Sequence, residues 1–77
     1  MTISNDQIIN ITEYLFPNYN SLEYHDNGEQ IVVNVIEEED SIEFYFKYII
    51  YKTPFKITIN DKRIPSNKLK KIKEILI

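Results

Sequence analysis

The sequence predicts a single small α+β domain, in which a four-stranded antiparallel meander lies between one helix at each end of the chain. Two observations predict this class. Segments between residues 21 and 59 alternate apolar and polar side chains with the period of a half-buried strand, and both terminal segments carry apolar residues at helical spacing. The chain has 77 residues, enough for one hydrophobic core but not for two. We therefore expect one domain over residues 1–77, in the order α-β-β-β-β-α.

The first segment has the start and stop signals of a helix. Ser4 and Gln7 have the spacing of a capping box, in which each side chain binds the backbone N–H of the other residue. Pro17 is expected to end this helix, because the residue before a proline avoids helical dihedral angles. The apolar stripe of the helix consists of Ile8, Ile11 and Leu15.

A β-hairpin is predicted around Asn27-Gly28, the residue pair that most favours a type I′ turn. A two-residue loop at this pair places Tyr24 opposite Ile31 and Leu22 opposite Val33. These apolar residues then share one face of the sheet, and polar residues take the other face. Turn chemistry and hydrophobic pattern agree on this register.

The third strand is expected to begin at Ile42, from which apolar side chains alternate without interruption. Pairing of Val35 with Ile42 leaves Glu37–Asp40 as the loop between the second and third strands. Phe55, Ile57 and Ile59 supply the inward face of a fourth strand.

The remaining segment predicts a loop followed by a helix. Asn60–Arg63 is polar and is expected to be the loop, and Pro65 or Ser66 begins the helix. The buried stripe of this helix is expected to consist of Leu69, Ile72, Ile75 and Leu76.

Charge is divided unevenly along the chain. Residues 1–46 contain ten of the twelve acids and no lysine or arginine, whereas residues 47–77 contain all nine bases. An asymmetry of this kind indicates electrostatic partners. Two interpretations stay open. Either the two halves pack together and offset each other, or the folded surface keeps an acidic end and a basic end.

The outward face of the third strand is the first candidate interface. Tyr45, Ile49 and Tyr51 align on it with Lys47 between them, and the predicted register places Val32 opposite Tyr45. An open sheet face with aromatic and aliphatic groups usually marks an interface, for which tyrosine is well suited. If a helix or a long loop covers this face, the same residues belong to the core. The sequence leaves both alternatives open.

The acidic segment Glu37–Asp40 is the second candidate. Its carboxylates can bind a basic groove of a protein in place of the phosphates of a nucleic acid, or they can form a solvated turn that blocks edge association. Together, the two candidates predict a protein-binding site that consists of Val32, Tyr45, Lys47, Ile49, Tyr51, Glu37, Glu38, Glu39 and Asp40. A homodimer through the same sheet face is compatible with this pattern.

The alternative function is nucleic-acid binding through the basic C-terminal helix, where lysines would contact phosphates without reading sequence. Its candidate residues are Lys62, Arg63, Lys68, Lys70, Lys71 and Lys73. The run Lys70-Lys71-Ile72-Lys73 resembles the start of the final helix in double-stranded-RNA-binding domains. The chain departs from that family in its tight first turn, its predicted fourth strand and its acidic second hairpin.

No motif of catalysis or metal binding is present. Cysteine is absent, and His25 is the only histidine, at an exposed hairpin position where water is not excluded. We therefore expect no enzyme activity, no metal and no cofactor. No stretch has the roughly 18 apolar residues of a membrane helix, so a cytoplasmic protein without membrane contact is expected.

In size, acidity and lack of catalytic motifs, the chain resembles phage-encoded inhibitors of host defence systems, such as anti-CRISPR proteins. The resemblance implies a small non-enzymatic protein that masks a larger protein partner, in the host cytoplasm if a phage encodes it. We expect a protein with a basic surface as the partner and regard nucleic acid as the less favoured ligand.

Overall fold

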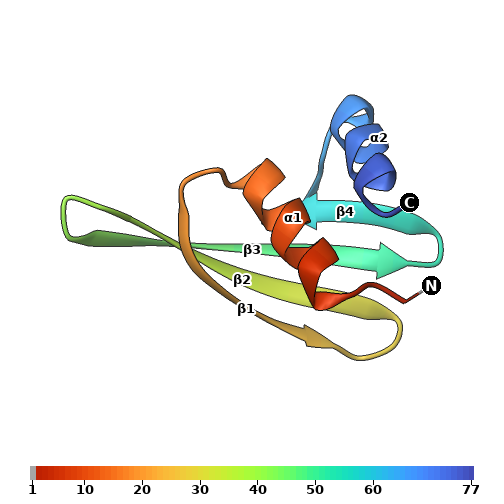
Figure 1. Ribbon diagram of the computed structural model, residues 1–77, viewed down its shortest axis with the longest axis horizontal. Coiled ribbons are helices and arrows are strands. Elements are labelled where there is room, and N and C mark those ends of the chain that lie inside the picture. Colours follow the sequence, from red (N-terminus) through yellow and green to blue (C-terminus); the bar gives the residue numbers. More distant parts are fainter. Residues whose placement is uncertain (1) are drawn as a thin grey trace.

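Five antiparallel strands form a meander that carries both helices of the structure (Figure 1). The computed structural model describes residues 2–77, and its strands are joined in the order β1-β2-β3-β4-β5. The predicted fold class is confirmed, with a short fifth strand added. The elements are α1 (Asn5–Leu15), β1 (Tyr19–Asp26), β2 (Gln30–Glu39), β3 (Ile42–Lys52), β4 (Phe55–Ile59), β5 (Lys62–Arg63) and α2 (Ser66–Ile75).

Both helices pack on the same face of the sheet, and the core lies between them and the strands. Ile8 and Ile11 of α1 and Ile72 of α2 are fully buried. Burial of such aliphatic side chains contributes about 1.5–3 kcal/mol each, which a domain of this size needs. Ile3 and Phe16, on either side of α1, are also buried, and the sheet contributes six core residues from one face, Ile31, Val33, Val35, Tyr48, Ile50 and Ile57.

The start of α1 confirms the predicted capping box. The backbone N–H of Gln7 donates to Ser4 Oγ at 3.2 Å, and the N–H of Ser4 donates to Gln7 Oε1 at 2.8 Å. The helix ends at Leu15, and Phe16 caps it immediately before Pro17. Local chemistry alone therefore determines both ends of α1.

A buried polar pair joins α1 to the centre of β3. The hydroxyl of Thr12 lies 2.9 Å from the carbonyl of Ile8 and 2.6 Å from the hydroxyl of Tyr48. Thr12 has one proton and donates it to Ile8, so the Tyr48 hydroxyl donates to Thr12 Oγ1. Both hydroxyls are satisfied, which removes the cost of burying them. Burial raises the pKa of Tyr48 to about 12.

The predicted register of the first hairpin is wrong by two residues. Tyr24 pairs with Val33 rather than Ile31, and the loop is Asn27–Glu29 rather than Asn27-Gly28 alone. Among these loop residues, only Gly28 has a positive φ, at 94°, whereas a type I′ turn at Asn27-Gly28 requires positive φ at both residues. A shift of two keeps every side chain on its predicted face, so the predicted faces are confirmed.

The second hairpin is longer than predicted. Val35 pairs with Phe46 instead of Ile42, and the strands continue to the pair Glu39–Ile42. The loop is Asp40-Ser41, whose φ values of 52° and 65° fit a type I′ turn. Extension of the ladder gives hydrogen-bond partners to backbone groups that a four-residue loop would leave to solvent. The acidic segment therefore lies mostly in β2 rather than in a loop.

The segment predicted as a loop at Asn60–Arg63 instead contains a turn and a strand. Asn60 and Asp61 have φ values of 50° and 70° and reverse the chain. Lys62 and Arg63 then pair with the end of β4 as β5. Helix α2 begins at Ser66 after Pro65, as predicted. Its predicted stripe is confirmed too, because Ile72 is buried and the other three apolar residues pack partly against the core.

β2 and β3 extend beyond the helices as a two-stranded ribbon, residues 37–44, at the left end of Figure 1. The molecule measures 38 Å along its longest axis and 26 and 23 Å along the others. Helix α2 lies toward the other end of that axis. The acidic ribbon and the basic helix α2 therefore lie apart on the folded surface, whereas Asp26 of the acidic half and Lys52 of the basic half form an ion pair.

Candidate protein-binding surface

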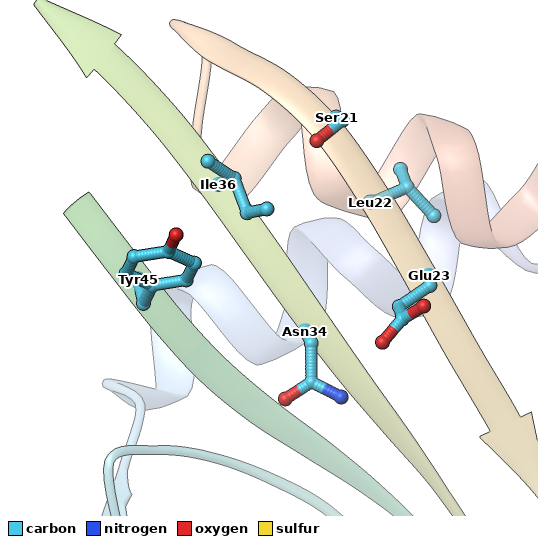
Figure 2. Close-up of a pocket in the computed structure, with 6 residues that line it drawn as sticks. All are labelled: Ser21, Leu22, Glu23, Asn34, Ile36 and Tyr45. Carbon is cyan, nitrogen blue, oxygen red and sulfur yellow. The ribbon is translucent and has the colours of Figure 1, made fainter. Parts of the chain in front are cut away.

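The face of the sheet opposite the helices is uncovered within the described part of the chain, residues 2–77. Figure 2 views this outer face with the helices behind the sheet. Tyr45 is 71% exposed on it. The second alternative from the sequence, a helix or loop that covers these residues, is excluded because both helices pack on the inner face.

The register brings the predicted sheet-face residues together, with one change of neighbours. Val32 pairs with Ile49 rather than with Tyr45, and Tyr45 pairs with Ile36. Ile36 was missed because the predicted hairpin ended too early. Ile36 directly precedes the acidic segment and lies an even number of residues after Val32. The alternation of side chains along a strand therefore could have placed it on the same face as Val32. The outer face therefore carries an apolar strip that consists of Val32, Ile36, Tyr45, Ile49 and Tyr51.

One end of this strip is hollowed. An open depression of about 410 Å³ is lined by residues of three neighbouring strands, with Tyr45 and Ile36 on one side and Glu23 and Asn34 on the other (Figure 2). Such a depression suits an anchoring side chain at the centre of a protein interface. Carboxylate and amide groups at its rim add hydrogen-bond acceptors and donors.

The other end of the strip is basic. Lys47 lies on the outer face between Tyr45 and Ile49, and Lys56 pairs with Tyr51 on β3. The ammonium of Lys56 lies 4.6 Å from the centroid of the Tyr51 ring, which is cation–π distance. The outer face thus changes from acidic near the ribbon to basic near β4.

The ribbon carries carboxylates on both faces. Glu38 and Glu43 are directly opposite each other on the outer face, an arrangement of like charges that destabilises a strand pair. The only polar contact of these carboxylates within residues 2–77 is the amide of Asn20, 3.4 Å from Glu38. A cationic partner would relieve this repulsion. The acidic residues of the ribbon are Glu37, Glu38, Glu39, Asp40 and Glu43.

Apolar side chains are also exposed on the inner face of the ribbon. Ile42 is 58% exposed and Phe44 is 45% exposed, although the sequence places both on the core side of β3. The faces are as predicted, but the helices do not reach this far along the strands. The ribbon therefore offers apolar contacts on its inner face, where Phe44 pairs with Glu37 and Ile42 pairs with Glu39.

The six basic residues of the alternative site do not form one surface. Lys62 pairs with Ile59 and Arg63 with Thr58, so their side chains are on opposite faces of the sheet. On α2, a helical step of about 100° per residue separates Lys68 from Lys73 by about 140°. Lys73 lies over the ring of Phe55 at 5.8 Å.

The centre of the exposed face of α2 is also not purely basic. Lys71 lies 3.9 Å from Glu74 in an exposed ion pair, and Lys70 neighbours the same carboxylate on the helix surface. All four lysines of α2 are exposed to solvent. The helix thus presents a mixed charged face rather than a continuous row of cations.

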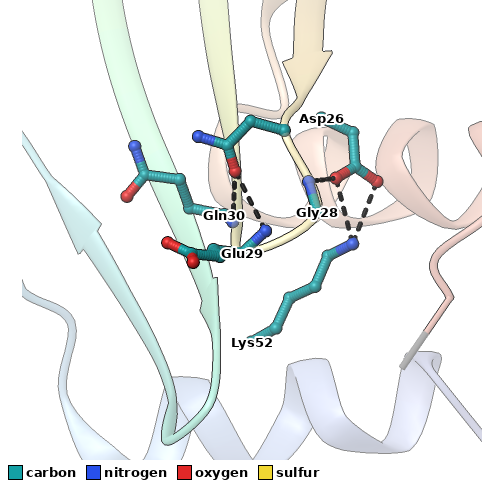
Figure 3. A network of polar contacts seen from close by, with 6 residues as sticks. Asp26, Gly28, Glu29, Gln30 and Lys52 are labelled. Atoms are coloured by element: carbon teal, nitrogen blue, oxygen red, sulfur yellow. Dashed lines mark hydrogen bonds and ion pairs between the residues drawn. The ribbon is translucent and has the colours of Figure 1, made fainter.

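A polar network holds the first hairpin (Figure 3). Asp26 accepts the N–H of Gly28 at 2.8 Å, and both of its oxygens lie 3.0 Å from the ammonium of Lys52. The hydrogen bond from Gly28 and then the bond from Lys52 hold the pKa of Asp26 below its usual value. The side chain of Asn27 accepts from the N–H groups of Glu29 and Gln30. These contacts give the register that turn statistics alone did not predict.

The lowered pKa of Asp26 predicts a loss of stability in acid. A carboxylate with a depressed folded pKa stabilises the fold above its unfolded pKa, and this contribution is lost as pH falls through the folded value. We expect the urea midpoint of the wild type to fall more steeply below pH 3.8 than that of Asp26→Asn, which has no charge to lose. Urea unfolding at neutral and acid pH measures this difference, and parallel curves would show that the pair contributes nothing.

No three side chains of the metal-binding types gather anywhere in residues 2–77. His25 is exposed on the outer face opposite Val32. Across the same residues, neither helix is long and apolar enough to cross a membrane.

Three comparisons with known proteins, against family models, curated sequences and solved structures, find no match. Function is therefore argued from this chain alone. Its most distinctive surface features are the open outer face and the acidic ribbon next to it.

Proposed function

We propose that the protein is a small non-enzymatic binding module that masks a basic surface of a larger protein, in the manner of phage or mobile-element inhibitors of host defence. The observation that carries this proposal is the uncovered outer face, where Tyr45 is 71% exposed at the end of the apolar strip that adjoins the acidic ribbon. Monomeric proteins seldom expose a contiguous apolar patch without a binding role.

The two parts of the surface have different tasks in this proposal. The apolar strip provides affinity, because aromatic and aliphatic groups release water when a partner covers them. The carboxylates of the ribbon steer a basic partner and orient it, which raises the association rate more than the affinity. The partner is thus expected to have a groove lined by lysine or arginine, such as the nucleic-acid channel of a protein.

Affinity capture from cells of the source organism tests the proposal with matched variants. Tyr45→Ala and Ile49→Ala remove the apolar contacts, and Glu38→Gln with Glu43→Gln removes ribbon charge while relieving the repulsion between those two residues. The captured partner is then purified and titrated against each variant protein. We expect each pair of substitutions to weaken its binding by about tenfold or more, which is about 1.4 kcal/mol. The loss caused by the charge variants should shrink as salt is raised.

Lys70→Gln with Lys71→Gln on α2 is the control and is expected to leave that affinity unchanged. The proposal is contradicted if all variants capture the partner equally well, or if only the α2 variant captures it less well. Light scattering of the wild type is the first measurement, since a homodimer through the outer face would bury the same residues. A dimer broken by Tyr45→Ala would identify a second copy as the occupant of this face.

Nucleic-acid binding is the second candidate. The separation of α2 from the carboxylates of the ribbon favours it, because phosphates could approach the lysines without strong repulsion. The dispersion of the basic side chains described above weighs against it. A mobility shift with double-stranded and single-stranded nucleic acid at low salt, lost in the Lys70→Gln and Lys71→Gln variant, would support this candidate, and absence of any shift would end it.

A further inference from the structure

β3 is longer than β4, the strand that pairs with the edge of β3 opposite β2. β2 pairs with β3 from Ile42 to Tyr51, whereas β4 pairs only with residues 48–52. The edge of β3 that faces away from β2 therefore has no strand partner over residues 42–47, as the left half of Figure 1 shows. It is closed at one point, where the N–H of Asn60 donates to the carbonyl of Lys47 at 3.0 Å.

Two hydrogen bonds determine which backbone groups point to this free edge. In an antiparallel strand the N–H and C=O of one residue point to the same side, and successive residues alternate. The carbonyl of Lys47 points toward the β4 side, and the N–H of Lys52 donates to Glu29 on the β2 side at 3.1 Å. The backbone N–H and C=O groups of odd-numbered residues in β3 therefore point to the β4 side, which is the free edge over residues 42–47. The N–H and C=O groups of Glu43 and Tyr45, and the N–H of Lys47, point out of the sheet.

This edge lacks the backbone features that usually prevent strand pairing, and its protection is limited to the charged side chains of Glu43 and Lys47. Edges are normally blunted by prolines, bulges or very short strands. β1 has a register shift between Tyr19 and Ser21, and β5 has two residues. The ladder of β3 with β2, in contrast, runs from Gln30 to Glu39 without a break. The free stretch is also rich in aromatic and β-branched residues, which favour strands.

Charge selects the kind of strand that could pair here. The ribbon carries five carboxylates, and residues 1–46 contain no base. A second copy of the chain would bring its own five carboxylates to this edge, so self-pairing is disfavoured. On the outer face an added strand would lie beside Glu43 and Tyr45, which suit lysine or arginine. On the inner face it would lie beside Phe44 and Phe46, which suit aliphatic side chains.

We propose that the free edge of β3 from Glu43 to Lys47 accepts an extended segment of the partner protein as an added strand, in which basic and apolar residues alternate. This inference rests on the proposed function and specifies how the partner binds. The main-chain hydrogen bonds provide affinity, and the alternating side chains provide specificity, as in other strand-addition complexes.

A blocked peptide that alternates lysine and valine, about seven residues long so that it spans the free edge, is the probe. We expect its binding, followed by NMR, to slow amide hydrogen exchange at Glu43, Tyr45 and Lys47 by about tenfold or more. The amides of Phe44 and Phe46 already face β2 and should change little. A matched peptide of alternating glutamate and valine should not bind.

Two N-methylated versions of the lysine–valine peptide separate strand addition from contact through side chains. One is methylated at every lysine nitrogen and the other at every valine nitrogen, so each blocks a different edge of the extended peptide. One version should bind as the unmodified peptide does, and the other should lose binding by about tenfold or more. Equal binding of both versions, or no protection of the three odd-numbered amides, overturns the inference.

Variants of the protein provide a second, independent readout. Tyr45→Pro removes an N–H that faces the free edge and costs no hydrogen bond to β2. Tyr45→Ala keeps that N–H and removes the ring. We expect the proline variant to bind the peptide more weakly than the alanine variant. If strand addition fails these tests while the outer-face and ribbon variants still weaken capture of the partner, the proposed function stands and only its mode of binding is wrong.

Discussion

Replacement of Tyr48 by alanine is expected to lower the free energy of unfolding by about 3–5 kcal/mol, the cost of deleting a large buried aromatic side chain. Tyr48 is fully buried, and its ring stacks with Phe16 at a centroid distance of 6.0 Å. The substitution also leaves the hydroxyl of Thr12 without the donor from Tyr48. A domain of this size has little stability to spare, so Tyr48→Ala should be largely unfolded in a urea titration at room temperature.

Tyr45→Ala is the matched control, because it removes the same side chain three residues away on the opposite face of β3. We expect it to change the free energy of unfolding by no more than about 0.5 kcal/mol, as for other exposed positions. A loss of about 2 kcal/mol or more in a monomeric protein would mean that the outer face is part of the core. That result would remove the basis of the proposed interface.

The second large effect is expected at alkaline pH. The pKa of Tyr48 is raised by burial from its ordinary value of 10.0 to about 12 in the folded protein. Above pH 10.0 the unfolded chain loses this proton while the folded chain keeps it, so the unfolded state binds fewer protons and stability falls as pH rises. The two-unit difference corresponds to about 2–3 kcal/mol, lost progressively as pH approaches 12.

Tyr48→Phe isolates this contribution. The variant keeps the buried ring and has no proton to lose, so its stability should decline less than that of the wild type over the same pH range. All other ionisable groups are the same in the two proteins, so their contribution cancels in the difference. Urea midpoints between neutral pH and pH 11 measure the effect, and an equal decline in both proteins would show that the Tyr48 hydroxyl is not protected by the fold.

Register was the main limit of reasoning from the sequence. Turn preferences predict a turn at Asn27-Gly28, but the side chains of Asp26 and Asn27 accept the N–H groups of the turn, and the pairing register differs by two residues. The predicted pairing of Val35 with Ile42 leaves the acidic segment in a loop, where adjacent carboxylates would be solvated. Pairing of Ile36 with Tyr45 and of Glu37 with Phe44 outweighs that preference and extends the ribbon.

These errors left the faces of the strands unchanged but altered the candidate surface. A shift by an even number of residues keeps each side chain on its face, so Tyr45, Ile49 and Tyr51 were grouped correctly. The shift in register between β2 and β3 added Ile36 to the candidate surface and placed Val32 opposite Ile49. The same register also gives β3 a free edge. The predicted four-residue loop did not suggest such an edge.

Local signals in the sequence predict the order of the two helices and the four longer strands, the ends of α1, the start of α2 and the two faces of each strand. These features depend on caps, prolines and periodicity, which act over a few neighbouring residues. The packing of both helices on one face, which leaves the outer face open, and the separation of the acidic ribbon from the basic helix arise only in the folded chain. Those outcomes depend on contacts between residues distant in the chain, such as the buried hydroxyl pair of Thr12 on α1 and Tyr48 on β3, and local patterns do not contain them.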